Sequence, residues 1–231
     1  MVCLITIIYP LHRDVSPPDS KHTCLRQWPE SWRRPGFPKQ TRFEGDIEEL
    51  EVSGKIPSCI NGTYFSIQTD HRYAPKYEHD VLFNGDGAVS AFRIFEEHVD
   101  RTRRYVQTDR FNAESDALRA LFGRYRNPYT DGPSVRHLIR TAANTNIVFW
   151  RGVMLALKED GPPFALDPVT LQTIGRYDFE GQVLSLTFSA HPKIDPVTSE
   201  IICFGYEAGG NGNDASRDII VCTIGPDQTF D

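Results

Sequence analysis

The chain has 231 residues, of which 39% are hydrophobic and 24% charged, a composition that is ordinary for a globular protein and unlike a disordered one. Its 25 basic and 31 acidic residues give a formal net charge of -6, and the basic residues are scattered along the chain. Binding to nucleic acid needs clustered positive charge that neutralises phosphates. We therefore expect no nucleic-acid partner.

The cysteine pattern indicates a reducing compartment. The chain has five cysteines, an odd number, and no Cys-x-x-Cys pair that would favour zinc or dithiol chemistry. The apolar run at residues 2–9 is shorter than a membrane span, and no clear cleavage site follows it. We expect a cytoplasmic protein in which membrane contact is not evident, because no stretch forms a convincing amphipathic helix.

The prolines and the turn residues divide the chain into two parts. Residues 1–45 are expected to form an irregular N-terminal arm, because repeated prolines interrupt any helical or strand period. From residue 46 to residue 231, short β-branched and aromatic runs alternate with turn residues, which predicts one domain of strands. The predicted strands are residues 62–68, 81–83, 89–95, 105–108, 147–150, 153–157, 201–206 and 219–224.

A single helical insertion is predicted at residues 112–122, where Ala113, Ala117 and Leu121 fall at helical spacing and Gly123 can end the helix. The rest of the pattern predicts an all-β fold.

A turn tetrapeptide occurs twice, as Asp167-Pro-Val-Thr170 and as Asp195-Pro-Val-Thr198. Proline fixes the backbone at the second position while the aspartate side chain caps its own turn, so each copy is predicted to reverse a strand. Strands grouped by fours with repeated turns favour a β-propeller over a sandwich, although Asp-Pro turns are common in any β protein. A lone histidine, His191, lies just before the second turn and is the strongest candidate for a metal ligand.

Five ordered motifs resemble the carotenoid cleavage oxygenase family, nearest its lignostilbene dioxygenase branch. The resemblance covers residues 46 to about 206. The motifs are Asn84-Gly-Asp-Gly87, Ala120-Leu-Phe-Gly-Arg-Tyr-Arg-Asn-Pro128, Ala143-Asn-Thr-Asn146, Leu155-Ala-Leu-Lys-Glu-Asp-Gly-Pro-Pro163 and Ala190-His-Pro-Lys-Ile-Asp-Pro196.

The resemblance implies a seven-bladed β-propeller that holds a non-haem ferrous ion through four histidines. Of these ligands only His191 falls within the chain, which ends before the segments where the family carries the others. The chain is therefore expected to be an N-terminal fragment with the first blades only. Glu159 matches a family carboxylate that orients a ligand imidazole, and the resemblance points to a histidine outside this chain, rather than His191, as its partner.

The resemblance also implies an oxidoreductase that uses dioxygen to split a carbon–carbon double bond into two carbonyl products. The expected partners are O2 and a small hydrophobic or phenolic alkene, either a stilbene or a carotenoid or apocarotenoid. In the lignostilbene branch a tyrosine and a lysine bind the substrate phenol. Tyr105 matches the tyrosine and Arg136 stands in place of the lysine, and an arginine can hold a phenolate but cannot act as a base. Ser90 fits the lignostilbene side, because many carotenoid cleavers have histidine there.

Each candidate residue also has a structural interpretation. His191 judged alone is more often a packed or surface histidine than a ligand, and Glu159 alone is an exposed loop carboxylate. Tyr105 alone is a packed strand residue, Arg136 a solvated cation, and Asn84-Gly-Asp-Gly87 a tight hairpin turn. The alternative function is that of a truncated, non-catalytic partial propeller that acts at most as a binding module.

The remaining candidates are assigned no role in chemistry. Four histidines show no metal-ligand spacing and are predicted to be surface or structural residues, and two aspartates are predicted to be turn residues. The histidines are His71, His79, His98 and His137, and the aspartates are Asp80 and Asp86. A hydrolytic metal site would need a cluster of carboxylates and histidines that the sequence does not contain.

Overall fold

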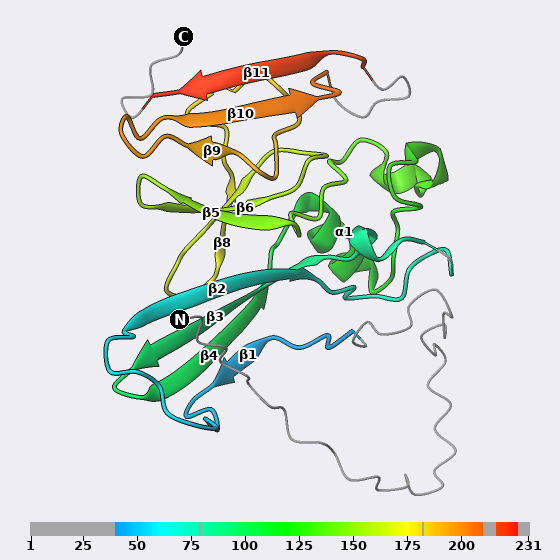
Figure 1. Cartoon of the computed structure of the whole chain (residues 1–231). Helices are drawn as coiled ribbons and strands as arrows, with labels where there is room; N and C mark the ends of the chain where they lie inside the picture. The colour runs from blue at the N-terminus through cyan, green and yellow to red at the C-terminus, as the bar shows by residue number, and fades with distance from the viewer. Residues whose placement is uncertain (1–39, 79, 182, 210–215, 226–231) are drawn as a thin grey trace, which may run out of the picture.

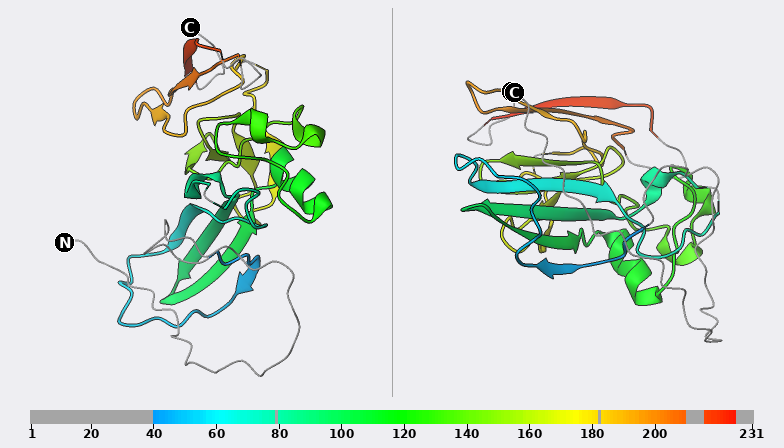
Figure 2. Two further views of the ribbon diagram at one scale, coloured as in Figure 1. Left: turned by 90° about the vertical axis from the view of Figure 1, so that its right-hand side faces the viewer. Right: turned by 60° about the horizontal axis from the view of Figure 1, so that its bottom comes forward.

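Three antiparallel sheets make up the part of the protein that the structure describes (Figure 1). The computed structural model describes residues 40–78, 80–181, 183–209 and 216–225. Each sheet is built from strands of one continuous part of the chain, and most paired strands are also neighbours in the sequence, the exception being β1 (Gly45–Ile47), which pairs with β4 (His98–Tyr105). The three sheets lie one above another, as in successive blades (Figures 1 and 2).

The first sheet has the strand order β1-β4-β3-β2, and β1 joins its edge by pairing with β4. Its strands are β1 (Gly45–Ile47), β2 (Gly62–Thr69), β3 (Gly87–Phe95) and β4 (His98–Tyr105).

The second sheet has the order β5-β6-β7-β8, and the third has the order β11-β10-β9. The second sheet consists of β5 (Asn146–Trp150), β6 (Val153–Leu157), β7 (Phe164–Leu166) and β8 (Thr173–Arg176). The third sheet consists of β9 (Lys193–Ile194), β10 (Ile201–Tyr206) and β11 (Ile219–Ile224).

Short helices lie together at one end of the sheets (Figure 1). They are α1 (Asp109–Ala117), η1 (Leu82–Asn84), η2 (Pro128–Thr130) and η3 (Pro133–Val135). No helix in the described residues is long and apolar enough to cross a membrane.

Strand β6 supplies side chains to the two larger apolar cores among the described residues. Met154 and Ala156 point into the core shared with the first sheet, and Leu155 and Leu157 point into the core shared with the third sheet. Successive side chains of a strand face opposite sides of a sheet, and here both sides are covered. This explains why the strand reads as a continuous apolar run instead of an alternating one.

Most of the strand predictions and the all-β class with a short helical insertion are confirmed. Residues 62–68, 89–95, 147–150, 153–157, 201–206 and 219–224 all lie within observed strands.

Two predicted strands are wrong. Val81 precedes the 3-10 helix η1, and Leu82 and Phe83 lie in it. The turn is held by the inward-facing Asn84 side chain, which donates to the Gly123 carbonyl and accepts from Arg110. Of the strand expected at 105–108, only Tyr105 lies in a strand, as the last residue of β4. Residues 106–108 lead into the helix, because the Thr108 hydroxyl accepts from the Phe111 N–H at its start.

The helix lies earlier than predicted, at Asp109–Ala117 instead of 112–122. Leu118 adopts a left-handed conformation, with φ 52° and ψ 31°, and its N–H bonds back to the Glu114 carbonyl. The Glu114 carboxylate then accepts the N–H groups of Leu121 and Phe122, at 2.9 and 3.0 Å. Beyond Leu118, these backbone N–H groups are therefore bound by the Glu114 side chain and not by the backbone carbonyls of a continuing helix.

The two Asp-Pro-Val-Thr turns share the same backbone hydrogen bonds, as their sequence predicts. Asp167 accepts the N–H groups of Val169 and Thr170, and Asp195 accepts those of Val197 and Thr198. The first turn joins β7 to β8 and the second joins β9 to β10, which occupy different positions in their sheets. The repeat is therefore a repeat of a turn and not of a whole blade.

The predicted division of the chain stays a prediction. Residues 1–39 of the predicted arm lie outside the described residues. Residues 45–47 already form β1, which pairs with residues 101–103 of β4. The second part of the chain, from residue 46, supplies the three sheets.

Candidate functional site

The first three of the five motifs meet at the end of the sheets that carries the helices. The Asn84 amide donates to the Gly123 carbonyl at 2.8 Å, which joins the first motif to the second. The Asn144 amide donates to the Gly85 carbonyl at 2.6 Å, which joins the first motif to the third. Gly87 has no room for a Cβ, which would lie 2.4 Å from the Ala143 carbonyl oxygen. The glycines of the first motif are therefore needed for close packing.

The fourth and fifth motifs are tied to the third. The Asn146 amide donates to the Ala190 carbonyl at 2.8 Å, which fixes the residue that precedes His191. The Phe188 N–H donates to the Gly161 carbonyl at 3.2 Å, just beyond Glu159. Segments that are far apart in the sequence are thus brought together around Glu159 and His191.

His191 and Glu159 face each other in the structure. The His191 Nε2 atom lies 3.5 Å from the Glu159 Oε1 atom, which is close enough for an ion pair but long for a hydrogen bond. The histidine side chain is 63% exposed and that of Glu159 is 24% exposed. Sequence reasoning pointed to a histidine outside this chain as the partner of Glu159, and the structure places His191 beside it. The metal-binding roles of both residues stay predictions.

The residues on either side of Glu159 point into the protein. Lys158 is buried, its ammonium lies 3.2 Å from Asp160, and it also donates to the Phe83 carbonyl at 3.3 Å. Burial lowers the pKa of Lys158, while Asp160 opposes this shift. Because Lys158 and Asp160 are held inward, Glu159 between them is directed toward His191.

An arginine from the second motif connects this region to the third sheet. The Arg126 guanidinium donates to the Tyr206 hydroxyl at 3.2 Å and lies 2.6 Å from the Glu207 carboxylate. It also lies 4.9 Å from the centre of the Tyr206 ring. Burial raises the pKa of the Tyr206 phenol, so this hydroxyl remains protonated at neutral pH.

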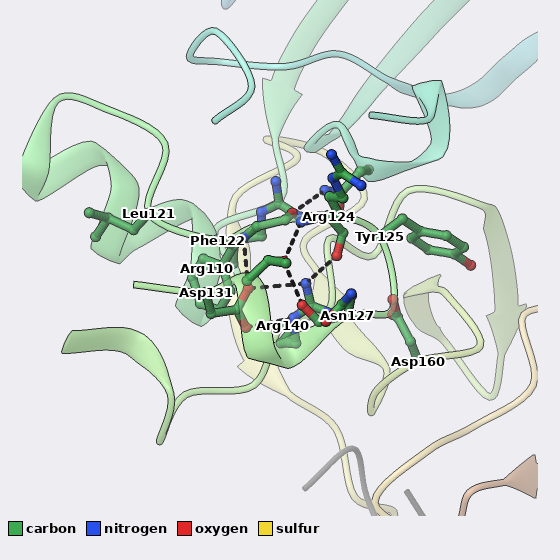
Figure 3. A network of polar contacts seen from close by, with 12 residues as sticks. Arg110, Leu121, Phe122, Arg124, Tyr125, Asn127, Asp131, Arg140 and Asp160 are labelled. Carbon is green, nitrogen blue, oxygen red and sulfur yellow. Dashed lines mark hydrogen bonds and ion pairs between the residues drawn. The ribbon is translucent and has the colours of Figure 1, made fainter. Parts of the chain in front are cut away.

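A network of buried charges supports the loops behind the site (Figure 3). Asp131 accepts from the Gly123 N–H at 2.7 Å and pairs with Arg140, whose Nε lies 2.8 Å from it. Arg140 also donates to the Arg124 carbonyl at 2.8 Å (Figure 3). Sequence reasoning missed this network. A sequence signal for charges in this region is the four-residue spacing of Arg110 and Glu114, and the structure buries both on α1.

Asp86 is buried, and its assignment as a turn residue is wrong. One carboxylate oxygen accepts from the Arg72 N–H at 2.9 Å, and the side chain lies just before β3. Burial raises the pKa of Asp86 to about 6, with Arg110 opposing the shift and Glu114 adding to it. The hairpin-turn interpretation of Asn84-Gly-Asp-Gly87 is also wrong, because these residues end η1 and begin β3.

Tyr105 is almost fully buried, with 1% of its surface exposed. Its ring stacks on Phe111 with 5.2 Å between centroids, and the Arg72 guanidinium lies 5.7 Å from its ring centre. The Tyr105 hydroxyl is buried without a hydrogen-bond partner among the described residues. Burial raises the pKa of Tyr105, and the nearby Asp70 carboxylate adds to this effect, so the hydroxyl is a proton donor.

Arg136 is exposed at the end of η3, and no hydrogen bond or ring contact within the described part of the chain joins it to Tyr105. His137 beside it is also exposed. The structure therefore places the two substrate-contact candidates in different environments, and their roles stay predictions.

The other histidines take the structural or surface positions expected of them, as far as they are described. His71 is buried, and His98 is exposed and hydrogen-bonded to Glu49 at 2.7 Å, which raises its pKa. His79 lies outside the described residues.

The described residues do not form a complete metal site. They contain no group of three or more histidine, cysteine, aspartate or glutamate side chains placed to hold a metal ion. His191 can offer one imidazole, and Glu159 can orient it or accept from it. One neutral imidazole matches the ligand chemistry of ferrous iron but is too few to hold it.

Comparisons with known proteins show what the chain is similar to. The family model described as retinal pigment epithelial membrane protein matches residues 38–229. "Resveratrol cleavage oxygenase 1" of Chaetomium globosum is 61% identical over 189 residues, which are 82% of this chain and 32% of that protein. The chain thus spans about a third of the length of this relative.

Two solved structures have the same fold as this chain. The lignostilbene dioxygenase of Pseudomonas brassicacearum superposes with a TM-score of 0.76 at 41% identity, over 83% of this chain and 39% of that one. A cobalt-substituted Synechocystis apocarotenoid oxygenase superposes with a TM-score of 0.64 at 25% identity, over 83% of this chain and 42% of that one. These matches confirm a partial β-propeller. Since the family model extends over most of its residues, the chain belongs to the carotenoid cleavage oxygenases, a family of oxidoreductases that depend on a metal.

Proposed function

We propose that this chain is part of a non-haem iron(II) dioxygenase that uses O2 to cleave the central double bond of a phenolic stilbene into two carbonyl products. The observation that carries the proposal is the set of hydrogen bonds that joins the five separate motifs, two of which bring Glu159 and His191 to face each other. The names of the relatives favour a phenolic stilbene over a carotenoid as the substrate class.

His191 would contribute one imidazole ligand, and the other ligands would come from residues beyond those described. Iron(II) in an imidazole shell would supply the chemistry of dioxygen activation. Glu159 would accept an N–H from an imidazole, which fixes the tautomer and the orientation of the ring. The hydrogen bonds to Ala190 and Gly161 would hold this pair in position.

Tyr105 and Arg136 would act on the phenol end of the substrate. The Tyr105 hydroxyl is a buried donor without a partner among the described residues, and such groups are costly unless a ligand satisfies them. Arg136 would stabilise the phenolate by its permanent positive charge, a role that needs no proton transfer. A phenolate donates electron density into the conjugated alkene, which favours attack by dioxygen.

The proposal is tested with the full-length gene product, loaded with ferrous iron under anaerobic conditions and then exposed to labelled dioxygen. A 4-hydroxystilbene should give two aldehydes that each carry one labelled oxygen atom, whereas the matched 4-methoxystilbene should react at least about 10-fold more slowly. Full-length protein that retains iron but consumes no oxygen with either stilbenes or apocarotenoids would overturn the proposal.

Two histidine variants test the ligand role. His191→Ala should lose both bound iron and activity, because the metal loses one imidazole. His98→Ala is the matched control, since this histidine has the same side-chain exposure of 63% and pairs with Glu49 at the first sheet, and it should keep both. Equal iron content in the two variants would show that His191 is not a ligand.

The phenol contacts are tested by their effect on different kinetic constants. Tyr105→Phe should lower kcat/KM for the 4-hydroxystilbene by about 10-fold to 100-fold, as expected for one hydrogen bond to a charged group, and should leave the 4-methoxy substrate unchanged. Arg136→Lys should retain more activity than Arg136→Ala. Equal losses with both substrates would assign Tyr105 to packing instead of binding.

One observation favours a second candidate for the chain by itself. Because the described residues hold no cluster of metal ligands, the 231-residue polypeptide alone would be a non-catalytic partial propeller that acts at most as a binding module. Anaerobic dialysis against ferrous iron should then leave less than stoichiometric metal on the isolated chain. Tight stoichiometric iron would contradict this candidate and favour a complete site. The cytoplasmic location stays a prediction.

A further inference from the structure

Two cysteines lie directly opposite each other in the third sheet. In the antiparallel pair of β10 and β11, Cys203 is the register partner of Cys222. Directly opposed residues of such a pair extend to the same face of the sheet, with Cα atoms about 4.5–5.5 Å apart. A disulfide usually spans Cα separations of about 4.4–6.8 Å, so the strands already hold the two residues at a suitable distance.

The surroundings confirm that the two thiols share one face. Cys203 is buried in the core between the second and third sheets, and Cys222 is partly buried against the same core. The Cys222 thiol is within hydrogen-bonding reach of Cys203. On the opposite face, Val221 is exposed. Both cysteines have free thiols, and Cys59 is a third free thiol, which is exposed.

We propose that Cys203 and Cys222 are a site of thiol–disulfide exchange, which a small disulfide such as oxidised glutathione converts into a cross-strand disulfide between β10 and β11. The half-buried Cys222 sulfur attacks one sulfur of glutathione disulfide, forming a mixed disulfide and releasing one glutathione thiolate. The Cys203 sulfur then attacks Cys222 and expels the second glutathione. Two protein thiols are oxidised, one glutathione disulfide is reduced to two thiols, and the two protein protons pass to the departing thiolates.

The two cysteines are expected to act in this order because their access to solvent differs. Cys203 is only 3% exposed, so a dissolved disulfide reaches Cys222 first. Burial raises the pKa of Cys203 to about 12, and Cys222 adds to this effect, which keeps Cys203 as an unreactive thiol until a neighbouring sulfur is activated. The pair is therefore expected to close through Cys222 and not through Cys203.

The test uses the whole chain with Cys3, Cys24 and Cys59 replaced by serine, so that only the two opposed cysteines remain. After incubation of the folded protein with excess glutathione disulfide, free thiols are alkylated and the intact mass is measured. The proposal expects the loss of two hydrogen atoms, no glutathione adduct and no alkylation. In this background, the reaction of the Cys203→Ser variant should stop at a stable glutathione adduct on Cys222. In the Cys222→Ser variant, Cys203 should remain unmodified by glutathione. Two thiols that remain alkylatable would overturn the proposal.

A register control separates strand pairing from random oxidation. In the same background, Cys222→Val combined with Val221→Cys moves one thiol to the adjacent position on the opposite face. This variant should form a glutathione adduct but no internal disulfide, and circular dichroism should show the β content of the parent. An internal disulfide at the same rate in this variant would mean that the strand register does not direct the reaction, and the proposal would fail.

Discussion

The space between the sheets and the region around the ends of β2 and β4 are both buried, but different forces hold them together. Between the sheets the interior is apolar, and β6 fills both sides with Met154 and Leu155 and their neighbours. Around the ends of β2 and β4 the interior is charged, with pairs such as Asp70–Arg103 and Asp131–Arg140. The first region depends on shape and volume, whereas the second depends on every charge having its partner.

The charged region is also the part of the molecule where the loops must take one conformation. Its carboxylates accept backbone N–H groups, as Glu114 does from Leu121 and Phe122, and they replace regular secondary structure there. Removing one partner of a buried pair is costly because it leaves the other charge without compensation. The apolar layers, in contrast, should tolerate changes that conserve volume.

The largest effect is expected from Asp70→Ala, because it leaves the buried Arg103 guanidinium without its partner. Both side chains are almost fully buried, at 2% and 1% exposure. The free energy of unfolding should fall by about 3–5 kcal/mol in urea denaturation. Asp46→Ala is the matched control in the same sheet, because Asp46 pairs with Arg104 at the surface, and it should cost less than about 1 kcal/mol. Equal losses would remove the distinction between the two pairs.

A smaller loss is expected in the apolar layers from Leu155→Ala, which opens a cavity between the second and third sheets. The free energy of unfolding should fall by about 3 kcal/mol. Leu155→Met conserves most of the volume and should cost less than about 1.5 kcal/mol. If methionine were as damaging as alanine, this core would depend on more than volume and shape.

The pH dependence of stability sharpens the comparison. Asp86 has a folded-state pKa of about 6, above its ordinary value of 3.8, so the folded state holds a proton that the unfolded state has lost between these values. Its contribution to stability is therefore complete below pH 3.8 and is lost as the pH rises through 6. Asparagine does not titrate, so Asp86→Asn should remove this loss. The free energy of unfolding of the variant, relative to that of the parent, should therefore rise by on the order of 2 kcal/mol between pH 4 and pH 7.

A turn aspartate provides the control of opposite sign. Hydrogen bonds from Thr170 lower the pKa of Asp167, so its contribution is present above its ordinary pKa and is lost as the pH falls. The free energy of unfolding of Asp167→Asn, relative to that of the parent, should therefore rise only as the pH falls into the acid range. If both variants showed the same sign, the burial of Asp86 would not be the cause of its effect.

The smallest effects are expected from Asp167→Ala and Asp195→Ala. Asp167→Ala removes three hydrogen bonds from an exposed turn and Asp195→Ala removes two, so each should lower the urea midpoint slightly, Asp167→Ala by somewhat more. The double variant should show the sum of the two, since the turns lie in different sheets. A loss as large as that of Leu155→Ala would mean that one turn is held by contacts beyond its own backbone.

The strands and turns could be predicted from the sequence because their signals are local. The run at 153–157 and the Asp-Pro-Val-Thr turns carry their own periodicity and turn chemistry. The helix could not be placed correctly, because Glu114 uses its side chain to end the helical pattern at a point that residue spacing does not show. The burial of Asp86 was missed for a similar reason, since a Gly-Asp-Gly segment has the composition of a turn.

The sequence by itself determined the all-β class, the family resemblance and the choice of His191 and Glu159 as candidates, because motifs and strand periods are properties of the chain. Only the tertiary structure decided that Glu159 faces His191, that Tyr105 has a buried hydroxyl, and that Cys203 opposes Cys222. These pairings join residues from different segments, and their distances depend on strand register and on how the sheets and loops pack together. Neither the strand register nor this packing can be predicted from local spacing in the sequence.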